Sequence, residues 1–172
     1  MIPGIFAKTF AGQPFEAARR AGYLAVQYNM ACAGLDPMPE EIPVELAAEI
    51  RADAAAAGIQ IAALSATYNM IHPDAAVRQS GLRRLRVLAK AARAMGTRLL
   101  TLGTGTLDPE DQWRRHPGND GPEPWRTLLE NMEKALAIAD EYDVDLGIEP
   151  EHANVVSSAQ RARRLIDELG SP

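Results

Sequence analysis

The chain has 172 residues, 47% hydrophobic and 24% charged, values typical of one soluble globular domain with a sizeable core. Its net charge of −5 argues against a nucleic-acid-binding surface, which is usually basic. Cys32 is the single cysteine and excludes a disulfide within the chain, and neither a secretory signal nor an apolar segment of membrane length is evident. We therefore expect a cytoplasmic protein that contacts neither nucleic acid nor membrane.

Short apolar runs alternate with segments of helical periodicity in the first half of the chain. In order, the expected elements are a strand at 2–6, a helix at 15–21, a strand at 24–28, a helix at 43–57, a strand at 59–64 and a helix at 74–95. Pro14 and Asp74 suit helix starts, and Gly22, Gly58 and Gly96 suit helix ends. On the helix at 74–95, a basic stripe lies opposite an apolar stripe, and we interpret it as a solvated outer face.

The second half continues the alternation. It contains a strand at 98–102, a long loop to Pro122, a helix opened by Pro124, a strand at 144–148 and a helix capped by Ser157 or Ser158. Long loops in a compact domain are usually functional or disordered, and a Trp flanked by Arg and His argues against disorder in this one. Five strand–helix units in succession predict an α/β fold with a parallel sheet and right-handed crossovers.

Glu149 directly follows the last predicted strand, and Pro150 stops that strand because proline has no N–H to donate. The carboxyl ends of parallel strands are where α/β folds place their chemistry. A lone carboxylate there has two interpretations. It is either part of an ion pair or helix cap, or it is a metal ligand or general base.

Several common catalytic motifs are missing from the strand-to-helix turns. The chain has no Gly-x-Gly-x-x-Gly fingerprint, no P-loop lysine and no Gly-x-Ser-x-Gly elbow, and Cys32 has no His or Asn in its local sequence. Polar side chains gather instead at the predicted strand ends, namely Lys8, Asn29, Asn69, His72, Thr104, Thr106, Glu149 and Glu151. In a closed parallel barrel these side chains would converge on one mouth.

Several segments together resemble a sugar phosphate isomerase/epimerase of the xylose isomerase-like TIM barrels, a group that also includes endonuclease IV. They are Gly-Ile-Phe-Ala-Lys-Thr-Phe at 4–10, Ala-Val-Gln-Tyr-Asn at 25–29, Ser-Ala-Thr-Tyr-Asn-Met-Ile-His-Pro at 65–73, Leu-Gly-Thr-Gly-Thr at 102–106, Trp-Arg-Arg-His-Pro at 113–117 and Ile-Glu-Pro-Glu at 148–151. The resemblance extends over essentially the whole chain. It is more specific for the superfamily than for the substrate.

The resemblance implies a (β/α)8 barrel with a divalent metal (Mn, Mg, Co or Zn) at its mouth, and metal-assisted proton transfer next to the carbonyl of a sugar or sugar phosphate. The family's metal ligands are a Glu, an Asp, a His and a Glu after strands five to eight, and only Glu149 has the position of one of them. Glu149 is thus expected to be both ligand and acid/base. For substrate binding, the expected residues are Tyr68, Asn69, His72, Trp113 and His116. The alternatives are a hydrogen bond to the backbone for His72, a solvent-exposed loop position for His116 and packing of the loop on the barrel for Trp113.

A complete barrel of this type takes about 250 residues. We therefore expect residues 1–172 to form a single, incomplete barrel domain of about five βα units, whose metal site is incomplete and which is inactive alone. Its open sheet edges would favour self-association. Two other functions stay open. One is an abasic-site endonuclease, against which the acidic charge and only three histidines count, and the other is a non-catalytic binding fragment.

Overall fold

The structure, a computed structural model, describes residues 2–171, which form five parallel strands in the order β1-β2-β3-β4-β5. The strands are β1 (Gly4–Phe6), β2 (Ala25–Tyr28), β3 (Gln60–Ser65), β4 (Leu99–Leu102) and β5 (Asp145–Ile148). The α-helices are α1 (Pro14–Arg20), α2 (Val44–Ala56), α3 (Ala75–Ala92), α4 (Pro122–Tyr142) and α5 (Ala159–Leu169). Short 3-10 helices lie at η1 (Ala7–Thr9), η2 (Met30–Ala33) and η3 (Pro117–Asp120). The predicted alternation of strands and helices is confirmed.

Local signals explain where several helices begin. Asp74 accepts a hydrogen bond from the backbone N–H of Ala76 at 2.8 Å and so caps α3. Ser158, one of the two expected candidates, caps α5 by accepting from the N–H of Arg161 at 3.3 Å. Helix α4 begins at Pro122, earlier than the expected Pro124, because Pro122 itself fills the first helical position.

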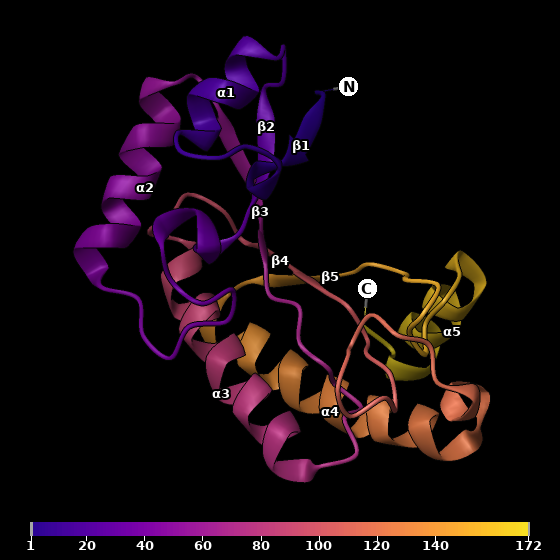
Figure 1. The fold of residues 1–172 in the computed structure, drawn as a ribbon. Coiled ribbons are helices and arrows are strands. Elements are labelled where there is room, and N and C mark those ends of the chain that lie inside the picture. The colour runs from indigo at the N-terminus through magenta and orange to yellow at the C-terminus, as the bar shows by residue number, and fades with distance from the viewer. Residues whose placement is uncertain (1, 172) are drawn as a thin grey trace.

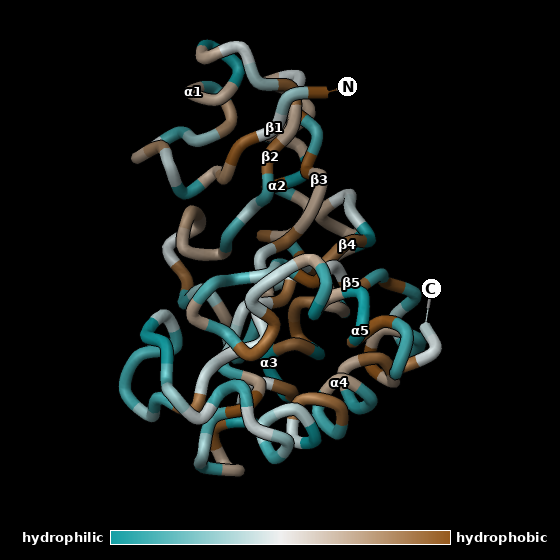
Figure 2. Tube along the Cα trace, turned by 90° about the vertical axis from the view of Figure 1, so that its right-hand side faces the viewer, coloured by the Kyte–Doolittle hydropathy of each residue, from teal (hydrophilic) through white to brown (hydrophobic). Residues whose placement is uncertain are grey.

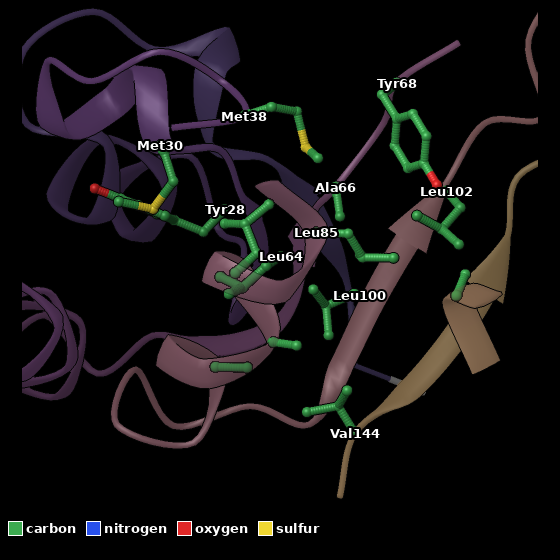
Figure 3. Packing of buried hydrophobic residues seen from close by; sticks show 14 of the residues in the cluster. Tyr28, Met30, Met38, Leu64, Ala66, Tyr68, Leu85, Leu100, Leu102 and Val144 are labelled. Atoms are coloured by element: carbon green, nitrogen blue, oxygen red, sulfur yellow. The ribbon is translucent and has the colours of Figure 1, made fainter. Parts of the chain in front are cut away.

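The main core lies between the sheet and the helices, which follow one another along one side of the strands (Figure 1). Leu64 and Leu100, on adjacent central strands, are at most 1% exposed, as are Leu85 of α3 and Leu128 of α4. Figure 3 shows Leu64, Leu85 and Leu100 close together in this core. Full burial of a leucine side chain stabilises a fold by about 2 kcal/mol, so the contacts of α3 and α4 hold the centre of the sheet.

The basic stripe of α3 faces solvent, as predicted. Its members Arg83, Arg86, Lys90 and Arg93 are all exposed, whereas the opposite side of the helix is buried against the sheet and α4. Arg86 and Arg93 form ion pairs with Glu141 and Asp143 at the end of α4.

The other face of the sheet is open along part of its length. Strands β1 and β5 each pair with one neighbour only, so they form the two edges of the sheet in the described chain (Figure 1). Residues of β1 to β4 line an apolar groove of about 430 Å³, and Phe6 at its margin is 46% exposed. Hydrophobic stretches follow the strands in Figure 2, whereas hydrophilic residues dominate many of the connecting loops.

Within residues 2–171, no helix combines the length and the apolar character that crossing a membrane requires.

Candidate functional site

A polar pocket of about 280 Å³ lies at the carboxyl ends of the strands. It is lined by residues at or after the ends of β1, β2, β3 and β5 and by the β4–α4 loop, namely Phe6, Lys8, Gln27, Asn29, Ala31, Pro37, Ser65, Thr67, Gln112, Trp113, Glu149 and Glu151. The predicted site residues that it brings together are Glu149 and Trp113. This edge of the sheet is where parallel α/β proteins generally bind ligands.

Glu149 continues the ladder of β5 by one residue. Its backbone N–H donates to the carbonyl of Leu102 at 2.9 Å, and Pro150 then ends the pairing. The half-buried carboxylate lies at the pocket wall, where Gln27 Nε2 approaches Glu149 Oε2 at 3.5 Å. The same Nε2 donates to Thr101 Oγ1 at 2.8 Å, so residues of β2 and β4 support the carboxylate from the inner face of the sheet.

The long loop between β4 and α4 is ordered by charged contacts and carries Trp113 into the pocket. Asp108 accepts hydrogen bonds from Arg114, with Nε at 2.5 Å and Nη2 at 2.8 Å. It also accepts from the backbone N–H groups of Glu110 and Asp111. The Arg114 hydrogen bonds hold the pKa of the Asp108 carboxyl well below its usual range. Trp113 itself is 50% exposed, which leaves a face of the indole free for a ligand.

Asn69 lies outside this pocket and holds the β4–α4 loop through hydrogen bonds to its backbone. Its buried amide donates to the carbonyl of Thr106 at 2.8 Å, and its Oδ1 accepts from the N–H of Thr106 at 3.0 Å. The N–H of Ile71 also donates to Oδ1, at 3.3 Å. Both ends of the amide are therefore occupied by backbone groups rather than turned toward a ligand.

Tyr68 also lies outside the pocket, in the core beneath α3. A Cβ built on Gly81 would meet Tyr68 Cδ2 at 2.0 Å, so the ring packs directly on the glycine of that helix. Its buried hydroxyl finds no hydrogen-bond partner among the described residues, and burial raises the pKa of Tyr68. The ring serves as a packing element rather than as part of the pocket wall.

The two predicted histidines hold loops rather than line the pocket. His72 Nδ1 accepts from the backbone N–H of Asp74 at 3.0 Å, and its Nε2 lies 3.1 Å from the carbonyl of Pro109, to which it donates when Nδ1 is the acceptor. His116 Nδ1 accepts from the N–H of Gly118 at 3.0 Å and so caps η3.

Gln27 and Asn154 are the residues of this region that the sequence patterns did not single out. Gln27 stands in the middle of β2, and strand alternation places it on the face opposite Val26, which is fully buried. Asn154 Oδ1 accepts from the N–H groups of Thr104 and Gly105, at 2.9 and 2.8 Å, and fixes the start of the loop. The alternation of side chains along β2 could have indicated that Gln27 faces the inside of the sheet. No local sequence pattern indicates the hydrogen bonds of Asn154.

Carboxylates in the pocket come only from Glu149 and Glu151. Among residues 2–171, no three His, Cys, Asp or Glu side chains come together in a way that would hold a metal ion. Divalent ions of the Mg²⁺ type take about six oxygen ligands. The described residues therefore do not fit a complete metal centre, although both carboxylates are of the type that such an ion prefers.

Comparisons with known proteins agree with this architecture. The sequence profile of a family described as xylose isomerase-like TIM barrel matches residues 15–172. No curated protein matches the chain. Among solved structures, D-psicose 3-epimerase from Clostridium cellulolyticum H10 with D-tagatose superposes with a TM-score of 0.74 at 16% identity, over 99% of this chain and 61% of that protein.

Two further structures are similar over nearly the whole chain. D-allulose 3-epimerase from Methylomonas sp. in complex with D-allulose has a TM-score of 0.73 at 19% identity, over 100% of this chain and 60% of that protein. A xylose isomerase-like TIM barrel protein from Mycobacterium smegmatis in complex with magnesium has a TM-score of 0.70 at 16% identity, over 99% of this chain and 61% of that protein. The chain thus spans about three fifths of the length of these relatives. The comparisons confirm the predicted fold, a TIM barrel represented by five βα units.

Proposed function

Because the chain belongs to the xylose isomerase-like TIM barrel family, we propose that its pocket is part of the active site of a sugar isomerase or epimerase. The observation that supports this proposal is the position of Glu149, a half-buried carboxylate at the carboxyl end of β5 and at the wall of a polar pocket. Epimerases among the similar structures support the reaction class.

Glu149 is the proposed acid/base. A carboxylate can remove a proton from a carbon next to a carbonyl and return it to the same or the neighbouring carbon, which interconverts epimers or an aldose and a ketose. Lys8, on the pocket wall, would stabilise the negative charge that develops on the substrate oxygen. The exposed indole of Trp113 offers an apolar surface for the C–H face of a sugar ring.

The charges of the pocket favour an uncharged sugar over a sugar phosphate. Its charged lining residues are Lys8, Glu149 and Glu151, so two carboxylates oppose one ammonium group. A phosphate dianion would be repelled by this balance, whereas hydroxyl groups can donate to the carboxylates and accept from the amides of Gln27 and Asn29.

The family resemblance implies a divalent metal, and the described residues that would hold it in this pocket are Glu149 and Glu151. Glu149 and Glu151 would supply two of the about six oxygen ligands that Mg²⁺ takes, and the others would have to come from water or substrate. We further propose that the 172-residue chain by itself binds sugar without turning it over, because its five βα units form only part of a (β/α)8 barrel.

The test is the substitution Glu149→Gln in a full-length version that carries all eight βα units of the barrel, assayed with D-allulose, D-tagatose and D-fructose. Loss of the acid/base should lower kcat about a thousandfold, with a small effect on KM, because the amide keeps the shape of the carboxylate. Wash-in of solvent deuterium at the carbon next to the carbonyl should disappear as well. Glu130→Gln, on the exposed side of α4, is the matched control and should leave both rates unchanged. Full activity in Glu149→Gln would remove Glu149 from the reaction.

A further inference from the structure

A second cavity, of about 470 Å³, lies between α1 and α2. It is formed by residues of the β1–α1 loop, α1, β2, η2 and α2, and its lining shares no residue with the pocket around Glu149. Its walls are of two kinds. Phe15, Tyr28 and Ile50 are buried, whereas the acidic side chains of Glu49 and Asp53 are exposed.

Tyr28 supplies a buried polar group that faces this cavity. Its ring stacks on Phe15 with centroids 5.3 Å apart and an interplanar angle of 17°. Only 3% of the residue is exposed, and its hydroxyl makes no hydrogen bond to another described residue. Figure 3 shows this hydroxyl on the side away from Leu64 and Leu100. Tyr28 lines the same cavity as Glu49 and Asp53. Burial, Cys32 and Asp53 all raise the pKa of Tyr28.

Two carboxylates of the acidic rim form no ion pair in the described chain. Glu16 is paired with Arg20 at 3.3 Å, but no Lys or Arg among residues 2–171 lies within 4.0 Å of the carboxylates of Glu49 or Asp53. These two residues stand one turn apart on α2, an arrangement in which like charges destabilise a helix. A cation bound between them would relieve this repulsion.

We propose that the cavity between α1 and α2 binds a small organic cation, namely an ammonium group on an apolar or aromatic body. The ammonium would pair with Glu49 and Asp53 and donate to the Tyr28 hydroxyl, while the body would pack on Phe15 and Ile50. An anion would be repelled by the carboxylates of Glu49 and Asp53. A bare metal ion is disfavoured because no group of three metal-ligating side chains exists in the described chain.

Phenethylamine and 2-phenylethanol are suitable probes, since they have the same body and differ in charge. In an NMR titration of the 172-residue chain, phenethylamine should shift the amide signals of α1 and α2 saturably. It should bind about fivefold tighter than 2-phenylethanol, the value of one partly exposed ion pair. Equal affinity for the two probes, or no saturable shift, would overturn the proposal.

Variants locate the binding and separate it from the sugar site. Asp53→Asn and Glu49→Gln should each weaken phenethylamine binding about twofold, so that the two together account for the fivefold preference, whereas Glu45→Gln, on the same helix but outside the cavity, should not change it. Glu149→Gln should also leave it unchanged, which keeps this test independent of the proposed function. An equal loss in Asp53→Asn and Glu45→Gln would indicate nonspecific attraction and contradict the proposal.

Discussion

Gln27 Nε2 lies 3.5 Å from Glu149 Oε2, although Gln27 stands in β2 and Glu149 follows β5. The contact is possible because the sheet curves, so that inner-face side chains of β2 and β4 converge with the end of β5. Thr101 of β4 completes the group through its 2.8 Å hydrogen bond with Gln27. The carboxylate is therefore positioned by strands that are distant from it in the sequence.

A double-mutant cycle on Gln27 and Thr101 tests this arrangement. Gln27→Met and Thr101→Val should each lower the free energy of unfolding by about 1 kcal/mol, because each leaves the other side chain without its partner. The double variant should lose less than the sum of the two, with a coupling of about 1 kcal/mol. Urea unfolding measures all three. Strictly additive effects would show that the hydrogen bond contributes nothing to stability.

Gly105 is predicted to be intolerant of a side chain because of its contact with Asn69. Its φ is +81°, and an added Cβ would meet Asn69 Oδ1 at 2.1 Å. Gly12 is the matched control, since its φ is +76° but nothing lies within 4 Å of an added Cβ. Gly12→Ala should cost about 1 kcal/mol of unfolding free energy from backbone strain alone, and Gly105→Ala at least about 2 kcal/mol more. Equal losses would mean that the loop shifts freely away from Asn69.

Tyr68 is predicted to contribute through its ring and not through its hydroxyl. Tyr68→Phe removes a buried oxygen without a partner in the described chain, so the free energy of unfolding should stay constant or rise by about 1 kcal/mol. Gly81→Ala in α3, which would normally favour a helix, should instead destabilise the protein because its Cβ would overlap the Tyr68 ring. Thermal unfolding of the two variants measures both effects, and a rise in Tm for Gly81→Ala would refute the packing argument.

The fold could be predicted because its signals are local. Strand and helix periods, the proline and glycine boundaries and the cap at Asp74 all operate within a few residues. The triplet Tyr-Asn-Met occurs twice, at 28–30 and at 68–70, and both copies have a common local structure. Asn29 accepts from the N–H of Ala31 at 3.0 Å and Asn69 from that of Ile71 at 3.3 Å, so both triplets form the same turn, directly after β2 in the first case and four residues after the end of β3 in the second.

The site could be predicted only in part, because side-chain direction after a strand depends on distant contacts. Glu149 was placed correctly at a strand end since Pro150 marks that end. The polar residues after β3 suggested a substrate surface, but the Asn69 amide turns toward Thr106 and His72 toward Pro109, both 37 residues away in sequence. No periodic pattern encodes such contacts.

Asp108 is predicted to make the stability of the protein sensitive to acid. Hydrogen bonds from Arg114 lower the pKa of Asp108 in the folded chain, whereas the unfolded chain has an ordinary value near 4. A group with a lowered folded pKa stabilises the protein above its unfolded pKa, and this contribution is lost as the pH falls toward the folded pKa. Asp108→Asn should therefore have a lower Tm than the parent at pH 7, and the difference should shrink as the pH is lowered from about 5 to 3.

Glu133→Gln, an exposed position on α4, serves as the control for the same change of charge. It should leave the dependence of Tm on pH close to that of the parent, since Glu133 accepts no hydrogen bond from a described residue comparable to that between Arg114 and Asp108. Differential scanning calorimetry at several pH values measures the three proteins. If the Tm difference between Asp108→Asn and the parent were constant from pH 7 to pH 3, the lowered pKa would not act on folding, and the loop would be held by its other contacts.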